Sequence, residues 1–197
     1  MTLITFQDGK PVMKDDGTIG TEQACCCAGA GECPDEIVVD GFIGPFAPAQ
    51  WARTQISGSS ATFQNGDTEL RIARNANINS GVASASIDVD SLFGHELLQV
   101  PEECCVTSIE YSYDWEWSTS NDTNDNFDFE SLPAPGEKFN TADPANGTYA
   151  SGPINGPQPF NFALGFQVDR VNQQAGVGTA IISNFQFTAY YEPCALP

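Results

Sequence analysis

The residues of this chain best suited to acid–base chemistry lie in residues 110–117, where carboxyl and aromatic side chains alternate. Glu110, Asp114 and Glu116 would share one face of an extended chain, because successive side chains of a strand point to opposite sides. Carboxylates at this spacing could act as acid and nucleophile of a retaining glycosidase, which holds them roughly 5–5.5 Å apart. Such enzymes have aromatic groove walls beside the carboxylates, whereas here the aromatic residues fall on the opposite face. The pattern favours a solvated acidic face, and we predict that the protein is not an enzyme.

The aromatic residues of this stretch favour a buried face; they are Tyr111, Tyr113, Trp115 and Trp117. The alternative is an exposed platform, since such rings offer an apolar face and a polar edge to a sugar. Under that alternative, Trp115 and Trp117 are the candidate glycan-contact residues.

Residues 121–128, NDTNDNFD, are rich in oxygen ligands and are a candidate Ca²⁺ site. The stretch lacks the glycine and terminal glutamate spacing of an EF-hand loop, and acidic turns are common in acidic proteins. We predict no other cofactor. Asn121 and Asn146 each begin an N-glycosylation acceptor sequence.

His95 is the only histidine, so any Ser-His-Asp or Cys-His arrangement would have to use it. Its surroundings, residues 93–96, match no nucleophile or base motif. The sequence therefore indicates no catalytic residues and a surface role for His95.

Seven cysteines bear on the compartment, and all are candidates for disulfide bonds: Cys25, Cys26, Cys27, Cys33, Cys104, Cys105 and Cys194. The competing interpretation is a tetrahedral metal site, but the C-x-x-C pairs that structural zinc sites prefer are absent. Adjacent cysteines in an extended chain point in opposite directions, which suits bridges to two different strands. We predict disulfide bonds of an oxidising compartment, with a pairing that the sequence does not reveal.

The composition limits the partners of the chain. Its 197 residues include 7 Lys plus Arg and 26 Asp plus Glu, for a net charge of −19. This charge repels nucleic acid and anionic lipid. No apolar run is long enough to cross a bilayer, so we predict no membrane insertion. The first residues lack a basic region followed by an apolar stretch, and a standard secretory signal is therefore not predicted.

Alternating apolar and polar residues predict strands that bury one face. The clearest are residues 179–191, residues 160–168 and the long stretch 106–118. Asn65-Gly66 predicts a two-residue hairpin turn that places Ala61, Phe63, Leu70 and Ile72 on one face. Helical periodicity is nowhere sustained, with at most one turn at residues 96–100. These elements predict an all-β sandwich.

The domain organisation follows from where this pattern begins. Residues 1–36 are rich in Gly, Ala and Cys after a short apolar segment, and we predict an N-terminal extension there. Residues 37–197 form the predicted β-sandwich domain. Within it, residues 119–159 contain many prolines and predict a loop-rich insert.

Three stretches resemble the secreted bacterial jelly-roll or immunoglobulin-like sandwich domains. Residues 40–51, DGFIGPFAPAQW, resemble their opening GPFAPANW-type motif. Residues 113–119, YDWEWST, look like their central aromatic strand, and residues 179–185, TAIISNF, look like their closing TVTISNF strand. The resemblance implies the sandwich fold and a bacterial surface or matrix setting.

The layout also resembles subunits of donor-strand-exchange pili, in which an N-terminal strand completes the sheet of a neighbour. Leu3, Ile4, Thr5 and Phe6 would be the donor strand, and residues 15–34 the tether. The resemblance implies a structural subunit of an extracellular filament whose partner is itself, as a homopolymer. A simpler interpretation is that residues 4–13 form their own hairpin about Asp8-Gly9.

Two other functions stay open. One is a carbohydrate-binding surface module with glycans as partners, and the other is a phage virion decoration or tail protein. The filament and the carbohydrate-binding hypotheses place the protein outside the cell or on its surface, whereas the phage hypothesis places it on a virion.

Overall fold

The computed structural model describes residues 6–7, 10–11, 33–56, 59–75, 82–119, 127–132, 138–139, 144–155, 160, 162–170 and 176–194. The chain divides into two compact units, Met1–Glu32 and Cys33–Pro197. The elements are β1 (Phe6–Gln7), β2 (Lys10–Pro11), β3 (Glu36–Asp40), η1 (Gly44–Phe46), η2 (Pro48–Gln50), β4 (Ala52–Arg53), β5 (Gln55–Ile56), β6 (Ser59–Gln64), β7 (Glu69–Asn75), β8 (Ala83–Asp88), α1 (Val89–Leu92), η3 (Glu96–Leu98), β9 (Cys104–Thr119), β10 (Phe127–Leu132), β11 (Lys138–Phe139), β12 (Ala145–Ala150), β13 (Ile154–Asn155), β14 (Ala163–Arg170) and β15 (Val177–Pro193).

In the first unit, β1 pairs with β2 in antiparallel register, with Phe6 opposite Pro11 and Gln7 opposite Lys10. This pairing agrees with the simpler interpretation of residues 4–13 as a hairpin of their own, and Asp8 and Gly9 lie outside the described residues. Leu3, Ile4 and Thr5 lie outside the described residues.

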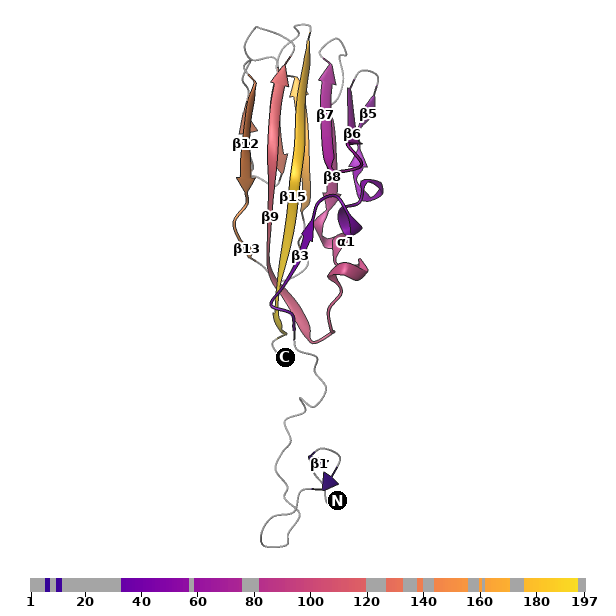
Figure 1. The fold of residues 1–197 in the computed structure, drawn as a ribbon, viewed down its shortest axis with the longest axis vertical. Helices are drawn as coiled ribbons and strands as arrows, with labels where there is room; N and C mark the ends of the chain where they lie inside the picture. The colour runs from indigo at the N-terminus through magenta and orange to yellow at the C-terminus, as the bar shows by residue number, and fades with distance from the viewer. Residues whose placement is uncertain are drawn as a thin grey trace. The chain divides into compact units, whose positions relative to one another are not determined.

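The second unit is a sandwich of two antiparallel sheets, which confirms the predicted fold class. One sheet has eight strands in the order β12-β9-β15-β7-β6-β5, with β13 added beside β9 and β3 beside β15. The other has five strands in the order β11-β10-β14-β8-β4. Figure 1 shows β12, β9, β15 and β7 of the larger sheet side by side.

The core between the sheets is built from the alternating residues of the long strands. On β9, Tyr111, Tyr113 and Trp117 are buried, and on β15 Phe185 and Phe187 are buried. The ring of Phe185 stacks on that of Phe42 at 5.3 Å between centroids. The aromatic face of residues 110–117 is thus the core face, as its spacing favoured.

The hairpin of β6 and β7 has the predicted shared face but a longer turn. Phe63 lies opposite Leu70 and Ala61 opposite Ile72, so that Gln64 and Glu69 close a four-residue turn instead of a two-residue one. Asn65, Gly66 and Asp67 all have positive φ, and the Thr68 hydroxyl donates to the Asn65 carbonyl at 2.9 Å. A two-residue turn is too short for three successive left-handed residues. The pairing of the two strands is therefore shifted by two residues, an even number that keeps every side chain on its predicted face.

The predicted loop-rich insert contains more regular structure than expected, since β10, β11, β12 and β13 all lie within residues 119–159. These strands are short and fit between the prolines: β12 begins directly after Pro144 and ends before Pro153. Within the described part of the chain, helices are single turns, and none is long and apolar enough to cross a membrane.

Two disulfide bonds join the ends of the second unit to the start of β9. Cys33 is bonded to Cys104 and Cys105 to Cys194. The neighbours Cys104 and Cys105 thus bond in different directions, as their adjacency predicted, but their partners lie just before β3 and just after β15 and not within strands. Cys25, Cys26 and Cys27 lie outside the described residues.

Candidate functional site

Three of the four aromatic residues of β9 are buried, and the fourth, Trp115, is partly buried. Trp117 is 2% exposed and Tyr111 is 2% exposed, and burial raises the pKa of the Tyr111 hydroxyl. Trp115 packs against the core, and its indole ring lies so close over Gly147 that an added Cβ there would come within 2.9 Å of it. A sugar could not stack on the buried ring of Trp117 without opening the sandwich, and the ring of Trp115 packs against the core and Gly147.

The acidic face of β9 is the outer face of the eight-stranded sheet. Asp114 accepts two hydrogen bonds there, from the Thr148 hydroxyl at 2.5 Å and from the Asn184 side-chain amide at 2.7 Å. Glu110 accepts from the Tyr190 hydroxyl at 3.4 Å. These contacts join β12, β9 and β15 by a row of polar side chains.

The hydrogen bonds from Asn184 and Thr148 lower the pKa of the Asp114 carboxyl. A carboxyl whose pKa is lower in the folded chain stabilises the fold above the ordinary carboxyl range. That contribution is lost as the pH falls through the folded-state pKa. Asp114 is therefore held ionised on the face that it shares with Asn184.

Replacing Asp114 by asparagine is expected to make the thermal unfolding midpoint less sensitive to acid. At about pH 6 the parent chain should be the more stable, and its advantage should shrink as the pH is lowered below roughly 4, where the carboxyl takes up a proton. Thermal unfolding followed by circular dichroism at several pH values measures this. Glu116→Gln, at an exposed position on the same face, is the control; an advantage that persists in acid would contradict the prediction.

A hollow of about 580 Å³ lies on this face, where two partners of β15 meet. β7 pairs with β15 up to Ile182, and β3 pairs with it from Gln186 onward. Between them the register of β15 shifts and Asn184 takes a φ of 47°. We call this hollow the outer-face groove; it is lined by Asp40, Gly41, Phe42, Ile43, Gly66, Asp67, Thr68, Ser112, Asn184, Phe185 and Gln186.

The groove combines polar groups held in position with one exposed aliphatic side chain. The Gln186 amide donates to Asp40 at 2.6 Å, which fixes both side chains across β15 and β3. Ile43 is 58% exposed at the wall. A smaller hollow of about 140 Å³ adjoins the groove through Ser112 and Gln186, which line both. The site thus offers carboxyl, amide and hydroxyl groups beside an apolar wall.

The sequence reasoning did not single out these groove residues. The polar positions of β15 were evident as a water-facing pattern, but nothing local shows that Asp40 of β3 lies beside Gln186, because the two are 146 residues apart. The paired strands, rather than a motif, bring them together.

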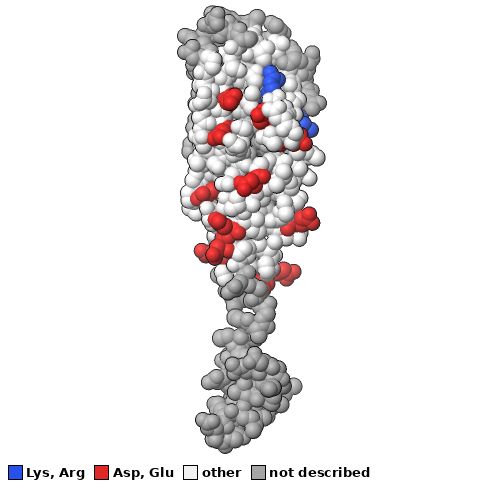
Figure 2. All heavy atoms as spheres, in the orientation of Figure 1, with Lys and Arg blue, Asp and Glu red and all other residues white. Residues whose placement is uncertain are grey.

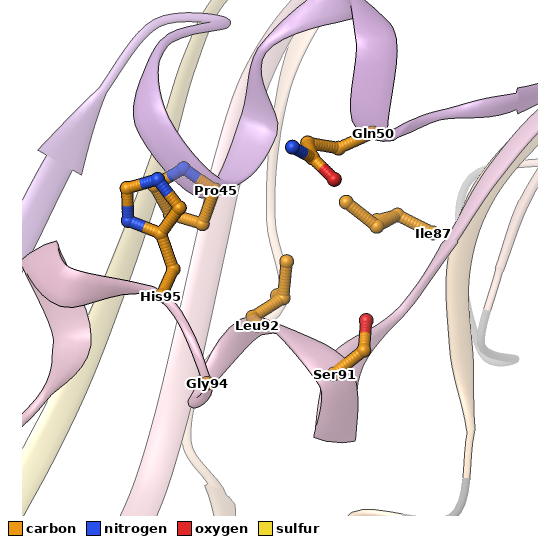
Figure 3. A pocket seen from close by; sticks show the side chains of 7 residues that line it. All are labelled: Pro45, Gln50, Ile87, Ser91, Leu92, Gly94 and His95. Carbon is orange, nitrogen blue, oxygen red and sulfur yellow. The ribbon is translucent and has the colours of Figure 1, made fainter.

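A second hollow, of about 290 Å³, lies between η1 and α1 and contains His95 (Figure 3). The Nδ1 atom of His95 accepts a hydrogen bond from the backbone N–H of Leu97 at 3.2 Å, and the Ser91 hydroxyl donates to the Asp88 carbonyl at 2.7 Å. Both side chains serve local turns. This hollow presents no arrangement of a nucleophile and a base.

The candidate glycosylation sites and the candidate Ca²⁺ loop lie only partly within the described residues. Asn146 lies on β12 with an exposed side chain, whereas Asn121 and residues 120–126 lie outside the described part. The candidate Ca²⁺ loop falls almost wholly in that stretch. Within the described ranges, no group of three or more His, Cys, Asp or Glu residues could hold a metal ion.

Comparison with known proteins gives matches in structure alone. No family model matches the chain, and no curated protein matches it in sequence. Among solved structures, the N-terminal cellulose-binding domain of Cellulomonas fimi β-1,4-glucanase C is similar at 11% identity and a TM-score of 0.33, over 85% of this chain and 100% of that one. The CBM22-1–CBM22-2 tandem domain of Paenibacillus barcinonensis Xyn10C is similar at 13% identity and a TM-score of 0.39, over 86% of this chain and 49% of that one.

The prediction of a pilus-like filament subunit that polymerises by strand insertion is wrong. The two solved structures named above are titled as a cellulose-binding domain and a CBM22 tandem domain, and neither is titled as a pilus subunit. A donor-strand acceptor needs a vacant strand position beside one of its own strands. In the described sheets, β15 has β9 along one edge and β7 and β3 along the other, so both of its edges are occupied.

Proposed function

We propose that the protein is a carbohydrate-binding module that acts outside the cell and holds its glycan in the outer-face groove. The observation that carries this proposal is the composition of the groove: hydrogen-bonding side chains fixed by their neighbours beside the exposed Ile43. A sugar ring presents the matching surface, with hydroxyl groups around an apolar C–H face. Disulfide bonds such as Cys33–Cys104 are typical of oxidising compartments and support the extracellular setting.

The prearranged side chains of the groove favour binding because little freedom is lost when a ligand arrives. Asp40 and Gln186 hold each other across β3 and β15, and Asn184 is held by Asp114. Each of these groups retains hydrogen-bonding capacity, since a carboxylate has two oxygens and an amide has both donors and an acceptor. They can therefore engage neighbouring hydroxyls without first breaking their own contacts.

The size of the groove also suits a glycan. Its volume of about 580 Å³ lies within the roughly 300–1,000 Å³ typical of small-molecule sites. The exposed large apolar side chains of the described residues are the aliphatic Val38, Ile43 and Leu97. Affinity would then depend on hydrogen bonds and shape more than on aromatic stacking.

The variant Ser112→Phe is expected to weaken glycan binding at least about tenfold. Ser112 lines the groove at the point where the smaller hollow adjoins it, and an aromatic ring there would occupy the space of the ligand. Binding to an array of neutral oligosaccharides, followed by calorimetry on the best ligand, measures the loss.

The matched control is Ser118→Phe, which adds the same ring to an exposed position of β9 that does not line the groove. It should bind as the parent chain does. If the two variants bind equally well, the glycan does not lie in the groove, and if the parent chain binds no oligosaccharide, the proposed function is wrong.

A further inference from the structure

The outer-face groove contains carboxylates that no basic side chain neutralises. Asp40 and Asp67 line it, and its lining residues include neither lysine nor arginine. Asp114 lies beside it, joined to the lining residue Asn184. Among the residues that the structure describes, Asp40 accepts a hydrogen bond from the neutral Gln186 but forms no ion pair, and neither does Asp67.

These carboxylates are accessible from solvent. Asp40 and Asp67 are both exposed, and Asp67 lies in the turn between β6 and β7 with a φ of 66°. The neighbouring Gly66 has open space where a Cβ would be, with nothing within 4 Å. The Oδ1 atom of Asp40 receives the Gln186 amide, so the second oxygen of that carboxylate remains to accept from a ligand. The carboxylates of Asp40 and Asp67 are thus both open to solvent.

The excess of acidic side chains in the whole chain also favours ligands of positive charge. The chain has 26 acidic and 7 basic side chains. Figure 2 shows red acidic atoms spread over the face in view, with blue basic atoms near its upper end. A surface of one sign raises the local concentration of ligands of the opposite sign and lowers that of ligands of the same sign.

We propose that the groove selects glycans that carry free amino groups. This inference rests on the proposed function and names the class of glycan that the same site prefers. A protonated amine on a sugar ring is a compact cation with three donors, and its hydrogen bonds to carboxylates are charge-assisted. Asp40 and Asp67 are the acceptors, while the sugar hydroxyls meet Gln186, Asn184 and Thr68. An N-acetylated sugar loses the charge, and a uronic acid reverses it.

The test compares three oligosaccharides of equal length: a glucosamine tetramer, an N-acetylglucosamine tetramer and a galacturonic acid tetramer. Calorimetry at about pH 6 and about 0.1 M salt should show the glucosamine tetramer binding about tenfold more tightly than its N-acetylated form, with no binding of the uronic acid. Tenfold equals about 1.4 kcal/mol, the size expected for two unit charges acting at contact distance across water. The preference should shrink at about 1 M salt, where charges are screened beyond about 3 Å.

Variants of Asp40 and Asp67 test whether the preference for the amine arises in the groove. The double variant Asp40→Asn/Asp67→Asn keeps the shape of both side chains and removes their charge, so the ratio of glucosamine to N-acetylglucosamine affinity should fall below about threefold. Asparagine suits the left-handed backbone of position 67, which protects the fold. Glu116→Gln removes one carboxylate charge from an exposed position on the same sheet outside the groove and should leave the preference intact.

Each outcome decides a separate point. Equal binding of the glucosamine and N-acetylglucosamine tetramers would overturn the amine preference and leave the proposed function standing. A preference unchanged in the double variant would also overturn it, as would equally tight binding of trilysine, since the surface would then respond to any cation. Failure of all neutral and amino oligosaccharides to bind would overturn the proposed function itself.

Discussion

Replacing Phe185 by alanine is expected to lower the free energy of unfolding by about 3–5 kcal/mol, the range for removing a buried aromatic ring. Phe185 is 1% exposed. Its ring contacts those of Phe42, Phe46 and Trp51, with centroids 4.9–6.2 Å apart. Phe42, Phe46 and Trp51 also contact the rings of Phe63, Phe187 and Phe166, respectively, so they cannot all move into the space left behind. Chemical denaturation in urea measures the change.

Val38→Ala is the control for this variant. Val38 lies on β3 and is 43% exposed, so its truncation should change stability by about 0.5 kcal/mol or less. The backbone of Phe185 also borders the groove, where its carbonyl accepts from the Gly41 N–H at 2.6 Å. We therefore expect Phe185→Ala to weaken glycan binding as well. A loss of stability under 1 kcal/mol would contradict the close packing of this aromatic cluster.

Removing the Cys105–Cys194 bond with Cys105→Ser/Cys194→Ser is expected to cost about 2–5 kcal/mol of stability. The two residues are 89 positions apart, so the bond strongly restricts the unfolded chain. The chain-entropy relation places a loop of this length near the upper end of the range, at about 4–5 kcal/mol. Urea unfolding of the double variant under non-reducing conditions measures the effect.

Changing both cysteines leaves no new thiol to form a wrong bond. The matched comparison is Cys33→Ser/Cys104→Ser, whose residues are 71 positions apart and which should cost a similar amount. In the parent chain, a reducing agent should reproduce the sum of the two losses or unfold the domain outright. A double variant as stable as the parent chain would show that the bond does not constrain the unfolded state.

The long strands and their faces could be predicted because their signal is local. The alternation in residues 110–117 and 179–191 specifies which side chains enter the core, whatever the partner strands are. The aromatic face of β9 was assigned to the core on that basis, and Tyr113, now 1% exposed, lies there. The adjacency of Cys104 and Cys105 predicted bonds in different directions for a similar reason, since neighbouring side chains diverge.

The groove could not be predicted because it depends on pairing between distant strands. Its polar side chains meet only because β3 pairs with the second half of β15 and β7 with the first half. Neither the shift of register near Asn184 nor its positive φ leaves a recognisable pattern in the sequence. The filament prediction failed for the same reason: the layout of an N-terminal segment says nothing about whether a sheet has a vacant edge.

The two disulfide bonds also determine how the second unit responds to mechanical force. Cys33 and Cys194 are bonded to the adjacent residues Cys104 and Cys105, so a covalent path joins them through a single peptide link. Tension applied to the chain at Cys33 and Cys194 would follow this path and would leave residues 34–103 and 106–193 unstretched. The outer-face groove lies within those bypassed segments, so a bound ligand would be held by a site that keeps its shape under tension.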